Sequence, residues 1–147
     1  MYRRILIATD GSDLSARAVA SAVELAASLH ATLVALYVVP RYPVSYFEGG
    51  ASVSQEEIAR VEKQWADKGQ AVVDGVVKSA AAKGVEARAV VSCSDLVAEA
   101  VMGAAKKHEC DLIVMASHGR KGLQRVLLGS ETQQVLTHST TPVLVLR

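Results

Sequence analysis

A polar segment rich in glycine, residues 116–132, contains residue types that suit the binding of a phosphate group. Gly119 lets the main chain approach an anion closely or adopt a positive φ. Gly129 and Ser130 open a short predicted helix, whose free N–H groups and positive dipole end favour a negative ligand. Cationic side chains lie between these glycines: Arg120, Lys121 and Arg125. The same spacing also fits a plain turn in which Ser130 and Gln133 form a capping box, so the pattern alone leaves both interpretations open.

Other kinds of phosphate or nucleophilic site lack their sequence patterns. The chain has no G-x-x-x-x-G-K-[ST] loop and no G-x-G-x-x-G fingerprint after its first predicted strand. A phosphoryl-receiver domain needs an aspartate where the third predicted strand ends, and this chain has Val91-Ser92-Cys93 there. Ser12, His118 and Asp10 are the residue types of a hydrolytic triad, but no G-x-S-x-G elbow accompanies them. Hydrolysis by such a triad is therefore disfavoured.

Apolar, β-branched segments alternate with amphipathic ones along the whole chain. The predicted strands span residues 5–8, 32–39, 85–91, 111–116 and 141–146, and the predicted helices span about 14–29, 54–83, 96–108 and 130–138. The predicted helix N-caps are Ser12 or Asp13, Ser54 with Glu57 as its capping-box partner, and Ser94 or Asp95. Residues 40–53 are predicted to connect two elements. This alternation predicts one α/β domain over residues 1–147, with an open parallel five-stranded sheet and helices on both faces, as in Rossmann-like folds.

In such a sheet, ligands bind beyond the carboxyl ends of the strands, where the strand order reverses. The first predicted strand ends at Thr9-Asp10-Gly11-Ser12, and the fourth ends at Ala116-Ser117-His118-Gly119. The structure is therefore expected to bring these two segments together. We further predict that main-chain amides near residues 119 and 129–130 converge on one anion site beside the end of the first strand.

The composition excludes several classes of protein. Of the 147 residues, 50% are hydrophobic, and 16 Lys and Arg balance 15 Asp and Glu to give a formal net charge of +1. Neither nucleic acid nor an anionic membrane is a favoured partner for so balanced a chain. No apolar run has the length of a membrane span or a signal peptide, so we expect a soluble, cytoplasmic protein. Cys93 and Cys110 lie far apart, with no C-x-x-C spacing and no paired His, so we expect neither a disulfide nor a zinc site and interpret both as small core residues.

Several ordered sequence blocks resemble the universal stress proteins of the UspA superfamily, and the resemblance covers the whole chain. The matching blocks are Ile5-Leu6-Ile7-Ala8-Thr9-Asp10-Gly11-Ser12, Asp111-Leu112-Ile113-Val114-Met115, Ser117-His118-Gly119-Arg120, Leu127-Leu128-Gly129-Ser130 and Pro142-Val143-Leu144-Val145. Nucleotide-binding members of that family carry G-x2-G-x9-G-[ST]. Here Gly119 and Gly129-Ser130 match the motif, whereas Ala116 stands where its first glycine belongs. The resemblance implies a Rossmann-like sheet similar to that of the adenine nucleotide alpha hydrolases.

The resemblance also implies a ligand and the residues around it. The ligand would be ATP or another adenine nucleotide, with Mg²⁺ bridging phosphate oxygens. Asp10 would meet the ribose or the adenine edge, Ala8 would lie under the base, and the Val38 main chain would pair with adenine beside Met115. The residues around the phosphates would be Ala116, Gly119, Gly129, Ser130 and Thr132. No catalytic residue is implied, so any ATP hydrolysis would be slow.

Finally, the resemblance implies a homodimer that pairs through the last strand, residues 143–146, and protein partners that the sequence does not identify. An uncovered hydrophobic strand at a sheet edge fits such pairing. Two alternatives to a nucleotide-binding stress protein stay open. One is an interaction module of the same fold that binds no nucleotide, for which Ala116 is the best support. The other is a slow ATPase or nucleotidyl transferase.

Overall fold

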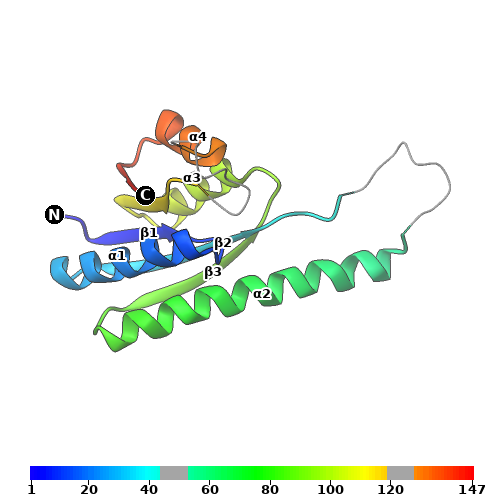
Figure 1. Ribbon diagram of the computed structural model, residues 1–147, viewed down its shortest axis with the longest axis horizontal. Helices are drawn as coiled ribbons and strands as arrows, with labels where there is room; N and C mark the ends of the chain where they lie inside the picture. The colour runs from blue at the N-terminus through cyan, green and yellow to red at the C-terminus, as the bar shows by residue number, and fades with distance from the viewer. Residues whose placement is uncertain (44–52, 119–127) are drawn as a thin grey trace.

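The computed structural model describes residues 1–43, 53–118 and 128–147, and strands alternate with helices along them (Figure 1). The elements are β1 (Arg4–Ala8), α1 (Asp13–Leu29), β2 (Thr32–Val39), α2 (Gln55–Ala82), β3 (Ala87–Cys93), α3 (Val97–Lys107), β4 (Leu112–Ala116), α4 (Ser130–His138) and β5 (Val143–Leu146). The five strands form one parallel sheet in the order β3-β2-β1-β4-β5. The predicted fold class, a single-domain open parallel α/β sheet, is therefore confirmed.

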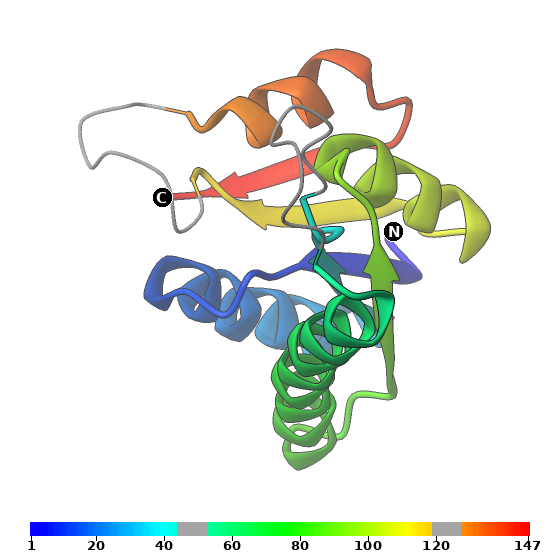
Figure 2. The same ribbon diagram turned by 90° about the vertical axis from the view of Figure 1, so that its right-hand side faces the viewer.

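Helices cover both faces of the sheet, which explains why the central strands are apolar on both sides (Figure 2). In β1, Ile5 and Ile7 pack into the cluster that α1 and α2 cover. Leu6 points the other way, into the cluster that α3 and α4 cover. All three side chains have no exposed surface. The alternation of faces along each strand decides which residues at its carboxyl end reach which side of the sheet.

The strand order reverses between β1 and β4. From β1 the chain moves outward through β2 to β3, and it then crosses back to β4 on the other side of β1. The loops that follow β1 and β4 consequently leave the same edge of the sheet side by side. This is the place where open α/β sheets bind ligands.

Side-chain caps confirm two of the predicted helix starts and correct the third. Ser12 accepts a hydrogen bond from the Ser15 amide, and Ser54 accepts one from the Glu57 amide. By contrast, α3 begins at Val97, later than a Ser94 or Asp95 cap requires, and its N-cap residue makes no side-chain hydrogen bond. Its first turn is capped from a distance, since the Glu131 carboxylate of α4 accepts a hydrogen bond of 3.2 Å from the Ala98 amide.

The long helix α2 extends beyond the sheet (Figure 1) and packs on it through one close approach. Gly69 is buried against the ring of Tyr37, and a Cβ atom there would lie 2.6 Å from the Tyr37 Cδ1 atom. A larger residue at position 69 would therefore push α2 away from β2. Glycine is needed here for space.

The two cysteines differ in their surroundings. Cys110 is buried as predicted, whereas Cys93 is exposed at the end of the edge strand β3, so the prediction of a core residue is wrong for Cys93. Cys93 is the last residue of β3, a strand that has a neighbouring strand on one side only. Among the described residues, no helix combines the length and the apolar character that crossing a bilayer requires.

Candidate functional site

The turn that follows β1 is held by a compact set of short hydrogen bonds. The buried hydroxyl of Thr9 lies 2.9 Å from that of Ser15, and it accepts the Gly11 amide at 3.2 Å. The Asp10 carboxylate accepts the Ser12 amide at 2.9 Å. Gly11 has a φ of 78°, a conformation that side chains disfavour, so glycine suits this turn. These bonds fix Asp10, half-buried, beside the end of β1.

The segment after β4 meets the start of α4 directly. The Gly129 amide donates to the Ser117 carbonyl at 2.6 Å, and the Thr132 hydroxyl donates to the Ala116 carbonyl at 2.9 Å. A Cβ atom at Gly129 would lie 3.2 Å from the Cα atom of His118, so only a glycine fits there without a shift. Residues 116–118 and 129–132 are therefore held together at the carboxyl end of β4.

The first turn of α4 has no side-chain cap within the described parts of the chain. Its N-cap is Gly129, so the alternative interpretation, a capping box of Ser130 and Gln133, does not hold: the Gln133 amide bonds the Gly129 carbonyl as an ordinary helical pair. The Gly129 amide is used within the protein, but the amides of Ser130 and the two residues after it have no intrahelical acceptor. These N–H groups and the helix dipole create a positive potential beside β4.

An apolar surface lies next to this helix end, on the sheet face that α3 covers. Ala8 from β1 and Val38 from β2 both pack against the cluster that contains Met115 from β4. The structure thus brings together the three predicted base-contacting residues. The Ala116 side chain belongs to the opposite cluster, under α1. Its methyl group consequently points away from Ala8, Val38 and Met115.

Several predicted site residues lie outside the described part of the chain, and one of the others is buried with its hydroxyl already bonded. The structure does not describe Gly119, Arg120, Lys121 and Arg125. The predicted convergence of amides near residues 119 and 129–130 can therefore be followed only at residues 129–130. Thr132 is buried, and its hydroxyl is engaged with β4. Ser130 is exposed at the start of α4.

The alternative hydrolytic triad is not assembled in the structure. The Ser12 hydroxyl caps α1, and the His118 Nδ1 atom shares a hydrogen bond of 3.1 Å with the Ser117 hydroxyl instead. Ser117 is 2% exposed, and sequence reasoning did not single it out as a site residue. A serine at the end of an otherwise apolar strand is the only local signal of its role. Its carbonyl and hydroxyl orient the Gly129 amide and the His118 ring.

A hollow of about 420 Å³ lies between α1 and α2, and at one end it reaches Thr9 and Gly11. It lies on the opposite face of the sheet from Met115, so it is distinct from the apolar residues Ala8, Val38 and Met115. No group of three or more His, Cys, Asp and Glu side chains within the described ranges could hold a metal ion.

Comparison with known proteins gives one consistent result. Residues 1–147 match the universal stress protein family. A universal stress protein of Methanocaldococcus jannaschii is 36% identical over 148 residues, which cover 100% of this chain and 83% of that protein. Among solved structures, universal stress protein UspA from Lactobacillus plantarum aligns with a TM-score of 0.86 at 26% identity, covering 99% of this chain and 98% of that one.

A crystal structure of a universal stress protein in complex with cAMP also aligns over 99% of this chain and 97% of that one, with a TM-score of 0.66 and 26% identity. The sheet order and the match over the full length define the class of protein. This chain belongs to the universal stress protein family.

Proposed function

We propose that this protein binds an adenine nucleotide, ATP with Mg²⁺, in the crevice between the ends of β1 and β4. The observation that carries the proposal is the first turn of α4, which has no side-chain cap among the described residues and is fixed against β4 beside the apolar surface of Ala8, Val38 and Met115. An uncapped helix end favours phosphate, and a neighbouring apolar surface favours a base. The cAMP complex of a related protein supports an adenine ligand.

Each part of the site has one task. The main chain of Val38 and the side chains of Ala8 and Met115 would contact the base, while Asp10 would accept hydrogen bonds from the ribose hydroxyls. Amides at the start of α4, with the Ser130 hydroxyl, would bind phosphate oxygens. Gly119 would complete the phosphate site from the segment that follows β4.

The missing first glycine of the motif does not exclude this ligand. The methyl group of Ala116 packs in the cluster under α1, on the other face from Met115. It therefore does not occupy the space over the base-contacting surface. Mg²⁺ would be coordinated by phosphate oxygens and water, because the described residues contain no metal-binding cluster.

Calorimetric titration with ATP and Mg²⁺ tests the proposal. Ser130→Asp places a negative charge at the exposed start of α4, where it repels phosphate and at the same time interacts favourably with the helix dipole. We expect ATP affinity to fall at least about tenfold in this variant while its thermal stability is kept. Gln55→Asp, at the equivalent first position of α2, is the matched control and should bind ATP like the parent protein.

Two outcomes would contradict this function. No heat at millimolar ATP would leave an interaction module that binds no nucleotide as the better description. Equal affinities in the parent protein and Ser130→Asp would show that the start of α4 does not bind the phosphates. If the protein binds ATP, its turnover should be slow, since the described residues of the proposed site hold no pair of side chains arranged as nucleophile and base. Mass spectrometry of nucleotide released from the denatured protein would identify the adenylate bound in cells.

We also propose that two copies pair through β5 to form a homodimer. This strand lies at the sheet edge, and Leu144 is 39% exposed, so an apolar strand edge faces solvent. Light scattering after size exclusion should give twice the mass of one chain, and Leu144→Lys should give a monomer. A monomeric parent protein would contradict this assembly. We expect this soluble dimer to act in the cytoplasm.

A further inference from the structure

A second hollow, lined by several polar residues, lies at the amino ends of the strands. The proposed nucleotide site lies at their carboxyl ends. Its volume is about 210 Å³, and its lining residues are Arg4, Thr32, Leu33, Val34, Glu86, Ala87, Arg88 and His108. The strand register explains why these residues meet. Arg4 pairs with Thr32, and Arg88 pairs with Val34, whose side chain packs in the cluster under α3. Arg4 and Arg88 therefore point to the same face, beside the C-terminal end of α3.

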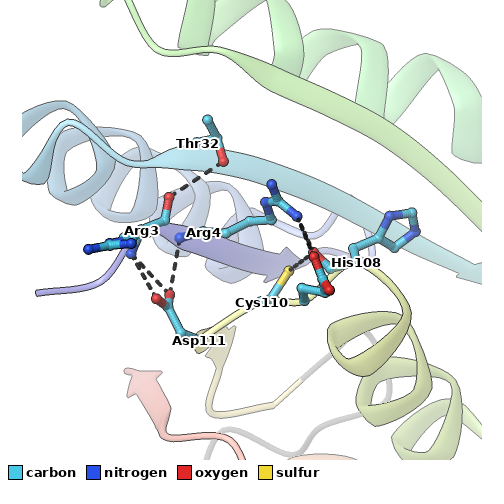
Figure 3. A network of polar contacts seen from close by, with 7 residues as sticks. Arg3, Arg4, Thr32, His108, Cys110 and Asp111 are labelled. Atoms are coloured by element: carbon cyan, nitrogen blue, oxygen red, sulfur yellow. Dashed lines mark hydrogen bonds and ion pairs between the residues drawn. The ribbon is translucent and has the colours of Figure 1, made fainter.

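The Arg4 guanidinium is fixed in place by the end of α3. Its Nη1 atom donates to the His108 carbonyl at 2.8 Å (Figure 3) and lies 3.7 Å from the carboxylate of Glu109, a side chain that is 86% exposed. The carboxylate of Asp111 bonds the main-chain amides of Arg3 and Arg4 and not this guanidinium. Arg4 thus keeps N–H donors beyond the one that the His108 carbonyl accepts.

Two arginines and one carboxylate line the hollow. Arg4 comes from β1, Arg88 from β3 and His108 from the end of α3, while Glu86 is the carboxylate. The exposed Glu109 carboxylate lies beside Arg4, 3.7 Å from its guanidinium. Partial burial lowers the pKa of His108, and the charges of Lys107, Arg88 and Arg4, in that order, lower it further. Two of these cations, Arg4 and Arg88, line the hollow and act on the same imidazole.

We propose that this hollow binds a phosphate group, with the guanidinium groups of Arg4 and Arg88 as its main donors and His108 at its rim. Guanidinium groups match phosphate oxygens through paired N–H donors. Arg4 on β1 and Arg88 on β3, the strands on either side of β2, line the same hollow. Since a water molecule takes about 30 Å³ in the liquid, the hollow is large enough for a phosphate or a small phosphomonoester. The site is independent of the proposed nucleotide site at the other end of the strands.

The test follows the imidazole of His108 by NMR while inorganic phosphate is added to the full-length protein. The chain has four histidines, and His108→Gln assigns the signal. We expect bound phosphate to raise the pKa of His108, because a nearby anion favours the imidazolium ion. Chloride at equal ionic strength should have a much smaller effect.

Variants show which side chains are responsible. Arg88→Gln should weaken phosphate binding about tenfold, because one charge-assisted contact is lost. Glu86→Gln removes the opposing carboxylate and should strengthen binding. Arg17→Gln, an exposed arginine on α1 at the other face, is the matched control and should change nothing. Ser130→Asp should also leave this response unchanged, which separates it from binding in the crevice.

A second probe, glycerol phosphate, distinguishes a site for a phosphomonoester from a site for the free phosphate ion. Tighter binding than that of inorganic phosphate indicates a site for a phosphomonoester, and weaker binding indicates a site for the free ion. The proposal is overturned if phosphate and chloride shift the His108 signal equally. It is equally overturned if Arg88→Gln binds phosphate like the parent protein.

Discussion

Thr132 of α4 donates a hydrogen bond of 2.9 Å to the main-chain carbonyl of Ala116, the last residue of β4. Thr132 is 3% exposed, so this bond is shielded from water. Together with the bond from the Gly129 amide to the Ser117 carbonyl, it fixes the start of α4 against the end of β4. The orientation of the proposed phosphate site therefore depends on a buried threonine as well as on its glycines.

Thr132→Val should destabilise the protein by about 1–3 kcal/mol, because the Ala116 carbonyl would lose its partner in a buried position that water does not reach. Thr132→Ser keeps the hydroxyl and should lose less. The measurement is the free energy of unfolding in urea. Equal stability of Thr132→Val and the parent protein would show that this bond does not hold α4 in place.

Two glycines of α2 should respond in opposite directions to the same substitution. Gly69→Ala should destabilise the protein by about 1–3 kcal/mol, because the new Cβ atom would meet the Tyr37 ring at 2.6 Å. Gly75→Ala should stabilise it by about 0.5–1 kcal/mol, because no atom lies within 4 Å of the new Cβ and alanine favours a helix. Thermal unfolding of both variants measures the contrast. A stabilised Gly69→Ala variant would contradict this packing of α2 on β2.

The first turn of α3 is capped by a side chain of α4, since the Glu131 carboxylate accepts a hydrogen bond from the Ala98 amide. Glu131→Ala should cost about 0.5–2 kcal/mol, the usual effect of losing an N-terminal cap, since the Ala98 amide would have no acceptor. Glu131→Gln retains an acceptor oxygen and should recover most of this loss. Hydrogen exchange at the first turn of α3 provides a local readout. Exchange there should be faster in Glu131→Ala and nearly unchanged in Glu131→Gln.

The thiol of Cys110 should remain protonated well above neutral pH. Burial raises the pKa of Cys110 to about 11, and the Asp111 charge acts in the same direction, while Arg4 opposes both. Iodoacetamide at pH 8.5 should therefore modify the exposed Cys93 and leave Cys110 unmodified until the protein unfolds. Mass spectrometry of the alkylated peptides distinguishes the two sites. Fast labelling of Cys110 in the native protein would contradict its burial.

The raised pKa of Cys110 also predicts how the free energy of unfolding depends on pH. The folded protein keeps the Cys110 proton above pH 9.0, where the unfolded chain releases it, so this group's contribution is complete below pH 9.0 and is lost as pH rises toward about 11. Cys110→Ala has no such group. The difference in unfolding free energy between the parent protein and Cys110→Ala should therefore change in favour of the variant across this interval. A constant difference would contradict the assignment.

Much of the fold was predictable from the sequence, because the relevant forces act between neighbours along the chain. Alternating apolar segments predicted the strands and helices to within a few residues, and Ser12 and Ser54 marked helix starts through contacts only three residues long. The α3 cap was missed because its acceptor, Glu131, lies 33 residues from Ala98 along the chain. No local pattern identifies such a partner.

The sequence by itself determined the element order, the apolar character of the sheet and the residues at the end of each strand, since periodicity and chain order are properties of one dimension. Only the tertiary structure decided that Gly129 uses its amide on Ser117 and that the methyl group of Ala116 faces α1. It also placed Arg4 and Arg88 on one face of the sheet. Strand order and register set these relations, and both arise from pairing between segments far apart in the chain.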